Sequence, residues 1–250
     1  MSDATPVTWV LLRGLTREQG HWGDFPDRLR AALPGAQVLT PDLPGNGSLH
    51  AQQSPTRVEA MADAVRATLH AAGAKPPYAV LAMSLGAMVS VAWANRYPDE
   101  LSRMVLINTS LRPFSPFWQR LRPQQYTTLL RLALLPTPPR VREAAILRAT
   151  TRLIAHAEPV LDHWQALRSE RPCSTRNALR QLLAAARFRA PLQAPPVPAL
   201  LLCSQRDALV DTRCSQAIAR AWQRPLAIHP AAGHDLPLDD TDWVIAQLLR

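Results

Sequence analysis

Residues 78–96 read YAVLAMSLGAMVSVAWANR, and this stretch decides the fold. Its first six residues form an apolar run with the length and composition of a strand that is buried on both faces. Ser84 and Gly86 interrupt the run, and helix-forming residues follow directly, as far as Arg96. A buried strand that turns at once into a helix is typical of an α/β layer with a parallel sheet.

The same alternation of apolar runs and helical stretches extends over most of the 250 residues. Apolar runs bounded by Gly or Pro predict six strands, at 8–12, 37–40, 78–83, 103–107, 199–203 and 226–229. Helices are expected at about 20–32, 56–71, 85–96, 213–222 and 241–249. We therefore expect an α/β fold with a mostly parallel six-stranded sheet flanked by helices, and right-handed crossovers.

Residues 112–192 break this alternation. They contain no β-branched run, and their apolar residues recur three or four positions apart, which is the spacing of amphipathic helices. Prolines between Pro136 and Pro172 are expected to divide the segment into several short helices. We therefore predict a core of residues 1–111 and 193–250, with a helical lid of residues 112–192 inserted after the fourth strand.

Basic charge is concentrated in the same segment. The whole chain has a formal net charge of +9, whereas residues 112–189 contain 14 arginines and four acidic residues, a surplus of +10. Three interpretations remain open: a solvated face, a contact with an acidic partner or a membrane surface, and a nucleic-acid site. Nucleic acid is the least expected partner, because no recognised binding motif accompanies the charge.

The sequence also carries signals about compartment and cofactors. No apolar run approaches the roughly 18–20 residues of a membrane-spanning helix, and Met1–Pro6 lacks the basic start and apolar stretch of a signal peptide. Cys173, Cys203 and Cys214 form no CxxC pair and lack the spacing of a zinc site. We expect a cytoplasmic protein without a membrane span, a metal or another cofactor.

Ser84 is the candidate nucleophile. The stretch Ala82-Met83-Ser84-Leu85-Gly86 nearly fits G-x-S-x-G, in which a sharp strand-to-helix turn exposes the serine hydroxyl above the sheet. Small residues are needed two positions before and after the serine because the turn brings backbones into contact. The pattern alone is common by chance, and its place between a strand and a helix favours a catalytic serine over an ordinary turn serine.

Candidates for a general base and its orienting acid follow the last two expected strands. Asp207 follows the fifth strand and His234 the sixth, in loops where side chains can face the nucleophile. An imidazole can accept and return a proton near neutral pH, and a carboxylate fixes its tautomer. Asp211 is a rival that lies four residues further on, and Asp235 is expected to make loop hydrogen bonds.

Backbone N–H groups and aromatic side chains complete the expected site. The N–H groups of Leu85, after the nucleophile, and of Leu15 are expected to hold an oxyanion. Gly14, before Leu15, allows an unusual backbone angle, although a simple strand-ending turn is the alternative. Four aromatic residues are expected to line an acyl pocket under the lid, or else to lie in the core: Trp22, Phe114, Phe117 and Trp118.

Together these motifs resemble the lid-bearing α/β-hydrolases. The resemblance is carried by LRGL at 12–15, DLPGNG at 42–47, AMSLG at 82–86 and GH at 233–234. Members usually have His-Gly in place of Arg13-Gly14, a departure that keeps the backbone donor but changes a charge near the pocket mouth. Members often have His in place of Asn46, and typically begin with two further strands, which the expected six-stranded core lacks.

The resemblance implies a serine hydrolase that cleaves a carboxylic ester or thioester through an acyl-enzyme. The motifs are most similar to small carboxylesterases of the pimeloyl-acyl-carrier-protein methyl ester esterase type. An arginine-rich lid would suit an acidic carrier protein or a coenzyme A ester as partner. The alternatives are an acyltransferase or cofactor-free haloperoxidase that uses the same triad, and a non-catalytic binding module of the same fold.

Overall fold

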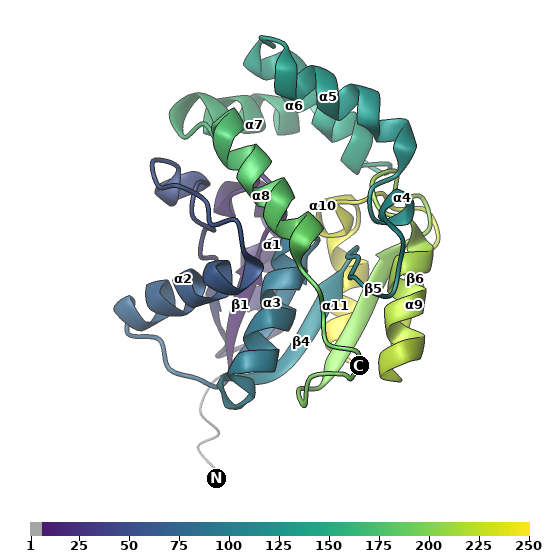
Figure 1. The fold of residues 1–250 in the computed structure, drawn as a ribbon. Coiled ribbons are helices and arrows are strands. Elements are labelled where there is room, and N and C mark those ends of the chain that lie inside the picture. Colours follow the sequence, from purple (N-terminus) through teal and green to yellow (C-terminus); the bar gives the residue numbers. More distant parts are fainter. Residues whose placement is uncertain (1–6) are drawn as a thin grey trace.

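The computed structural model describes residues 7–250, apart from the side chains of Ala133 and Leu134, so the expectation about Met1–Pro6 lies outside it. Within these residues, one six-stranded sheet has the order β2-β1-β3-β4-β5-β6, and its paired strands are parallel (Figure 1). The strands are β1 (Thr8–Leu12), β2 (Gln37–Leu39), β3 (Tyr78–Met83), β4 (Leu101–Ile107), β5 (Ala199–Ser204) and β6 (Leu226–His229). The expected α/β-hydrolase architecture with six strands is confirmed.

Helices cover both faces of the sheet. The flanking helices are α1 (Phe25–Ala32), α2 (Val58–Ala71), α3 (Leu85–Arg96), α9 (Thr212–Trp222) and α11 (Thr241–Leu248). Val10 and Leu12 belong to one apolar cluster with residues of α2, α3 and α9, whereas Trp9 and Leu11 belong to a second cluster with residues of α1 and α11 on the opposite face. Because both faces are covered, the central strands are continuous apolar runs instead of alternating apolar and polar residues.

Parallel strands bring the loops of the site to one edge of the sheet. β3 lies at the centre, and its pairing with β4 continues to its last residue, Met83, opposite Ile107. The loops after β1, β3, β4, β5 and β6 therefore start side by side. Short helices in the connections are η1 (Gln19–Trp22), η2 (Gly47–Leu49), η3 (Pro98–Glu100) and α10 (Leu236–Asp239).

Between β4 and β5 the chain is largely helical. We call residues 112–192 the insertion; its helices are α4 (Phe117–Arg120), η4 (Pro123–Gln125), α5 (Tyr126–Leu134), α6 (Pro139–Thr150), α7 (Ala157–Glu170) and α8 (Thr175–Arg187). In Figure 1, α5, α6 and α7 lie above the sheet. Pro159 does not divide a helix as expected, because it lies in the first turn of α7, where no intrahelical hydrogen bond is lost. No helix of residues 7–250 is both long and apolar enough to cross a membrane.

Part of the basic surplus holds the insertion on the core. Three of its arginines bind acceptors outside it: Arg122 binds Asp211 at 3.5 Å, Arg171 binds Glu18 at 3.1 Å, and Arg180 donates to the carbonyl of Ser54 at 2.5 Å. In the opposite direction, Arg17 of the core binds the buried Glu143 of α6 at 2.6 Å. Some arginines of the insertion therefore bind the core and do not belong to a solvated face.

The contact between α3 and β1 leaves no room for a side chain at Gly86. A Cβ there would lie 2.6 Å from the carbonyl oxygen of Leu12 and 2.7 Å from that of Arg13. We expect Gly86→Ala to lower the free energy of unfolding by about 1–3 kcal/mol, because backbone must move to admit the methyl group. Urea unfolding checks this, with Ser90→Ala, one turn further along α3, as the control. Equal stabilities of the two variants would contradict the tight contact.

Candidate active site

Ser84 sits in a strained turn between β3 and α3. Its φ of 50° and ψ of −113° lie in a region that residues other than glycine rarely adopt. The turn is held on both sides, because the Ser84 N–H donates to the carbonyl of Ile107 at 3.0 Å and Thr109 Oγ1 donates to the Ser84 carbonyl at 3.0 Å. Strained backbone of this kind persists where neighbouring structure fixes it, and it gathers at functional sites.

Gly14 lies against this turn. A Cβ on Gly14 would lie 3.2 Å from the Cβ of Ser84 and 3.8 Å from its Oγ. The expected unusual backbone angle is wrong for Gly14, since its φ is not positive; in this loop the positive φ belongs to Thr16, at 58°. A side chain at position 14 would press on Ser84, because the loop after β1 approaches this residue closely.

The structure brings Asp207 and His234 together. His234 Nδ1 lies 2.7 Å from Asp207 Oδ2, and both residues are buried. The second carboxylate oxygen of Asp207 accepts the N–H groups of Leu209 at 2.7 Å and Val210 at 2.9 Å. A carboxylate held in this way accepts the Nδ1–H, so Nε2 is left as the proton acceptor of the imidazole.

The surroundings of His234 act on its pKa in opposite directions. Burial is the largest influence and lowers the pKa. The charge of Asp207 and its hydrogen bond outweigh burial, so the pKa of the imidazole lies above its ordinary value of 6.5. The neutral form, which can accept a proton, therefore becomes dominant only above that ordinary value.

Ser84 and His234 share the wall of a cavity of about 210 Å³. The insertion supplies much of the remaining wall with apolar side chains, from Leu129, Leu132, Ile146, Leu179 and Leu182. Within residues 7–250, neither Ser84 Oγ nor His234 Nε2 has a hydrogen-bond partner, so both remain available to a ligand. Catalytic hydrogen bonds are often long in unliganded structures and shorten when substrate binds.

The two expected oxyanion donors adjoin this cavity. Leu15 lines it, and Leu85 is the first residue of α3, whose N–H has no acceptor inside the helix. Among residues 7–250, no acceptor is assigned to either N–H, whereas the neighbouring N–H of Thr16 donates to Gln181 Oε1 at 2.8 Å. The helix dipole adds positive potential near Leu85. Both groups could therefore receive a negatively charged oxygen.

Comparison with models of protein families assigns the chain to a family. A model of the alpha/beta hydrolase family matches residues 9–247. The chain belongs to this family.

Two curated relatives differ in how much of the chain they match. A candidate carbamate hydrolase, RutD of Cronobacter turicensis, is 30% identical over 232 residues, which cover 90% of this chain and 83% of the relative. A pimeloyl-[acyl-carrier protein] methyl ester esterase of Aromatoleum aromaticum is 39% identical, but over 106 residues that cover 40% of this chain and 36% of that enzyme.

Solved structures share the fold of this α/β hydrolase. A thermophilic esterase of Thermogutta terrifontis has a TM-score of 0.75 at 22% identity, with 98% of this chain and 89% of that chain covered. The enol-lactonase of Burkholderia xenovorans has a TM-score of 0.78 at 17% identity, with 100% and 92% covered. At such low identity, the likeness concerns the fold alone.

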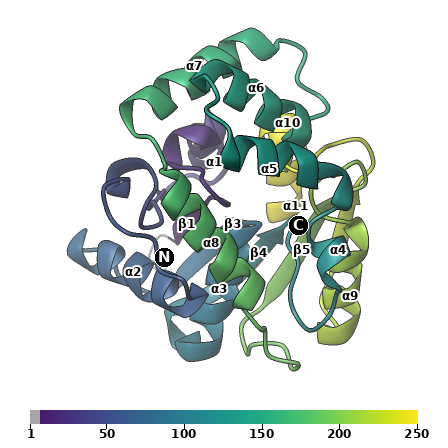
Figure 2. The same cartoon turned by 45° about the horizontal axis from the view of Figure 1, so that its top comes forward.

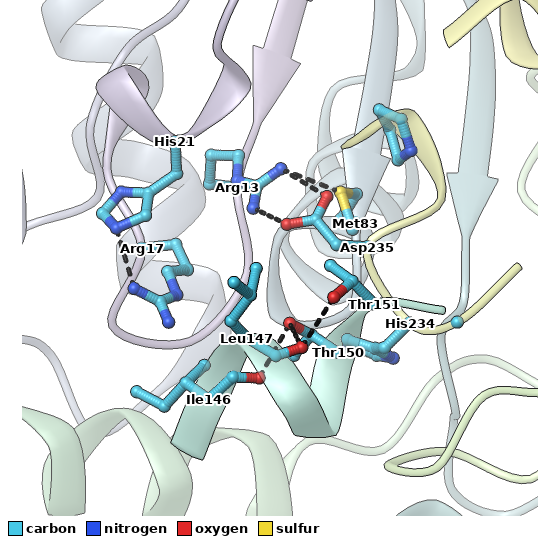
Figure 3. Close-up of polar contacts among 12 residues, drawn as sticks. Arg13, Arg17, His21, Met83, Ile146, Leu147, Thr150, Thr151, His234 and Asp235 are labelled. Carbon is cyan, nitrogen blue, oxygen red and sulfur yellow. Dashed lines mark hydrogen bonds and ion pairs between the residues drawn. The ribbon is translucent and has the colours of Figure 1, made fainter. Parts of the chain in front are cut away.

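Arg13, where other α/β hydrolases usually have His, forms a buried ion pair that sequence reasoning missed. Its guanidinium donates to both carboxylate oxygens of Asp235, at 3.0 and 2.5 Å (Figure 3). It also lies 4.7 Å from the ring centre of Trp22. The side chain of Asp235 thus binds Arg13, and its N–H donates to the carbonyl of Thr150 at 2.7 Å. Asp235 neutralises the changed charge, and both residues line the cavity that contains Ser84.

The rival carboxylate Asp211 has a different role. Its side chain accepts the N–H of Arg213 at the start of α9 and forms ion pairs with Arg213 and Arg122. These contacts lower the pKa of Asp211, chiefly through the hydrogen bond from Arg213. Of the two carboxylates weighed from the sequence, Asp207 is the one that contacts His234.

Two further residues brace the loop that carries His234. Asn108 Nδ2 donates to the His234 carbonyl at 2.8 Å, and its Oδ1 accepts the N–H of Ser204 at 2.8 Å. Asp239 accepts the N–H of Gly233 at 2.6 Å and that of Arg152, in the insertion, at 2.9 Å. Asn108 could have been suspected from its place directly after β4, whereas nothing in the sequence indicates the contact of Asp239.

The expected aromatic pocket requires correction. None of the four aromatic side chains is among those that line the cavity. Trp22 is buried beside Phe25 in the core. Phe114 packs on Trp222 of α9, with the two ring centres 5.6 Å apart. Phe117 and Trp118 are 69% and 52% exposed, so they point away from the interior. The sequence positions of these aromatic residues did not predict where their side chains point. Leucines of the insertion line the cavity wall instead.

Cys173 lines the cavity but does not compete with Ser84 as nucleophile. Burial is the main cause that raises the pKa of the Cys173 thiol to about 11, so the thiolate is scarce at neutral pH. Within residues 7–250, no three His, Cys, Asp or Glu side chains are grouped as ligands for a metal ion.

We expect NMR titration of the His234 imidazole to give a midpoint above 6.5. In Asp207→Asn the midpoint should fall, because burial then opposes the imidazolium without the neighbouring carboxylate charge. His163, an exposed histidine on α7, serves as the internal reference in both spectra. Equal midpoints for His234 in the two proteins would contradict the coupling.

The Arg13–Asp235 pair predicts non-additive stability. Arg13→Met or Asp235→Leu alone should lower the free energy of unfolding by about 3–5 kcal/mol, because each leaves a buried charge unpaired. The double variant should recover much of this loss, since both charges are removed together. Urea unfolding of all four proteins measures the coupling, and a double variant as unstable as the sum of the singles would refute it.

Proposed function

We propose that this α/β hydrolase is a serine esterase that cleaves a carboxylic ester or thioester. The observation that carries the proposal is the 2.7 Å contact between His234 and Asp207 at the wall of a cavity that also contains Ser84. Ser84 would be the nucleophile, His234 the general base and Asp207 the acid that orients it.

The mechanism follows from these roles. His234 Nε2 takes the proton of the Ser84 hydroxyl while Oγ attacks the acyl carbon, and the N–H groups of Leu15 and Leu85 stabilise the oxyanion. The alcohol or thiol leaves with the proton from His234, and an acyl-serine ester remains. Water, deprotonated by His234, then adds to the acyl carbon, so that the carboxylic acid is released and the serine hydroxyl is restored.

A carbamate is the second candidate substrate. The relative from Cronobacter turicensis, which matches 90% of this chain, is named for carbamate hydrolysis, whereas the methyl ester esterase matches 40% of the chain. We favour the ester because the wall beside Ser84 is largely apolar, which suits an acyl chain. Measuring kcat/KM for an aryl carbamate and for an aryl ester of equal size shows which of the two substrate classes the protein prefers.

The insertion is proposed to act as a lid that also receives the rest of the substrate. Its wall residues reach into the cavity from α5, α6 and α8, and Figure 2 shows α5 and α8 on the side that faces the viewer. Exposed arginines on the insertion, at Arg131, Arg176, Arg187 and Arg189, would attract an acidic carrier protein or a coenzyme A ester.

We expect Ser84→Ala to reduce the turnover of a short p-nitrophenyl ester by at least about 10³-fold, because the acyl-enzyme cannot form. Ser90→Ala, the same exchange further along α3, is the control and should retain turnover. Near-normal turnover in Ser84→Ala would refute the nucleophile, and absence of turnover in the wild type would favour a binding module. Products that contain an added alcohol acceptor would indicate an acyltransferase.

A further inference from the structure

One face of α6 runs along the cavity from a charged end to the candidate catalytic residues. Arg142, Ile146 and Thr150 are spaced four residues apart, and all three line the cavity. The carbonyl of Thr150 accepts the N–H of Asp235, directly after His234. Arg142 lies eight positions before Thr150, so its backbone lies about 12 Å along the helix axis from the contact with the His234 loop.

The wall of the cavity carries more positive than negative charge. Arg17, Arg142 and Arg168 line it, and Arg17 and Arg168 share one carboxylate, Glu143. Arg17 Nη1 lies 2.6 Å from Glu143 Oε2, and Arg168 Nη1 lies 3.6 Å from Glu143 Oε1. Among the side chains described in residues 7–250, Arg142 has no carboxylate within ion-pair distance, and it donates to the carbonyl of Leu132. Among the described side chains, two of these three guanidinium groups share one carboxylate and the third has none.

Burial makes this surplus costly. One guanidinium nitrogen of Arg17, Nη2, is buried without a partner in the described residues. Burial, and then the charge of Arg142, lower the pKa of Arg168. His21 accepts a contact from Arg17 at 2.8 Å (Figure 3) but adds no charge, because burial lowers the pKa of this imidazole well below its ordinary value. An anion in the cavity would offset the unpaired charge.

We propose that Arg142 and Arg168 form a subsite for a carboxylate at the far end of the acyl chain. The inference rests on the proposed esterase function and names its substrate class, the half-esters of linear dicarboxylic acids. The ester carbonyl would lie at Ser84, the methylene groups along Ile146 and Leu132, and the terminal carboxylate between the two guanidinium groups. Planar guanidinium groups suit this ligand because they can donate two parallel hydrogen bonds to a carboxylate.

The test compares matched pairs of substrates. Monomethyl esters of linear dicarboxylic acids are assayed beside methyl esters of fatty acids with the same number of heavy atoms. At one intermediate chain length, kcat/KM for the half-ester should exceed that for the neutral ester by at least about tenfold, as expected for hydrogen bonds to a charged group. The preference should persist at high salt, since a partly buried pair is weakly screened.

Variants separate the subsite from the general charge of the insertion. Arg142→Gln should lower the ratio of half-ester to neutral-ester kcat/KM about tenfold, and Arg142→Lys should keep part of it. Arg148→Gln removes the same charge from an exposed position of α6 outside the cavity and should leave the ratio at the wild-type value. Arg168→Gln is the second variant if Arg142→Gln does not fold.

The outcomes distinguish the two proposals. Equal kcat/KM for half-esters and neutral esters at every length, or equal effects of Arg142→Gln and Arg148→Gln, would overturn the subsite while the esterase stands. If the wild type hydrolyses no ester, the esterase proposal fails, and calorimetry with a free linear dicarboxylate still decides on the subsite. Binding that weakens in Arg142→Gln but not in Arg148→Gln would support it, and equal or absent binding would refute it.

Discussion

The strained backbone of Ser84 is the constraint on which the rest of the site depends. A φ of 50° is unfavourable for serine, and it persists because β3, β4 and the loop after β1 hold the turn from several sides. The absence of side chains at Gly14 and Gly86 permits this enclosure. Leu85, the first residue of α3, directly follows Ser84, so the same close contacts position the candidate nucleophile and one candidate oxyanion donor.

The insertion, which lines the cavity, is also hydrogen-bonded to the loop that carries His234. Thr150 and Arg152, at the end of α6, bond to the loop through Asp235 and Asp239, and Asn108 fixes the same loop from β4. The insertion therefore does more than cover the sheet. The last residue of α6 binds the loop that carries the candidate general base, and Arg142 lies near the start of the same helix. The length of α6 therefore sets the distance between Arg142 and this loop.

Much of the fold could be predicted from the sequence, because buried parallel strands have a strong local signature. β1, β3 and β6 begin and end where the apolar runs do. Directions of side chains could not be predicted in this way. Phe117 and Trp118 are apolar but exposed, and Arg13 is charged but buried, since its partner Asp235 lies more than two hundred residues away. Pairings of this kind arise from the tertiary structure and leave no trace in local spacing.

Peptide mass spectrometry of the protein after reaction with a fluorophosphonate tests the central claim most directly. The probe phosphonylates a hydroxyl only where a neighbouring base makes it nucleophilic. The account predicts one adduct, on Ser84, which disappears in His234→Ala although that protein remains folded. An adduct on another residue, or undiminished labelling of Ser84 without His234, would contradict it.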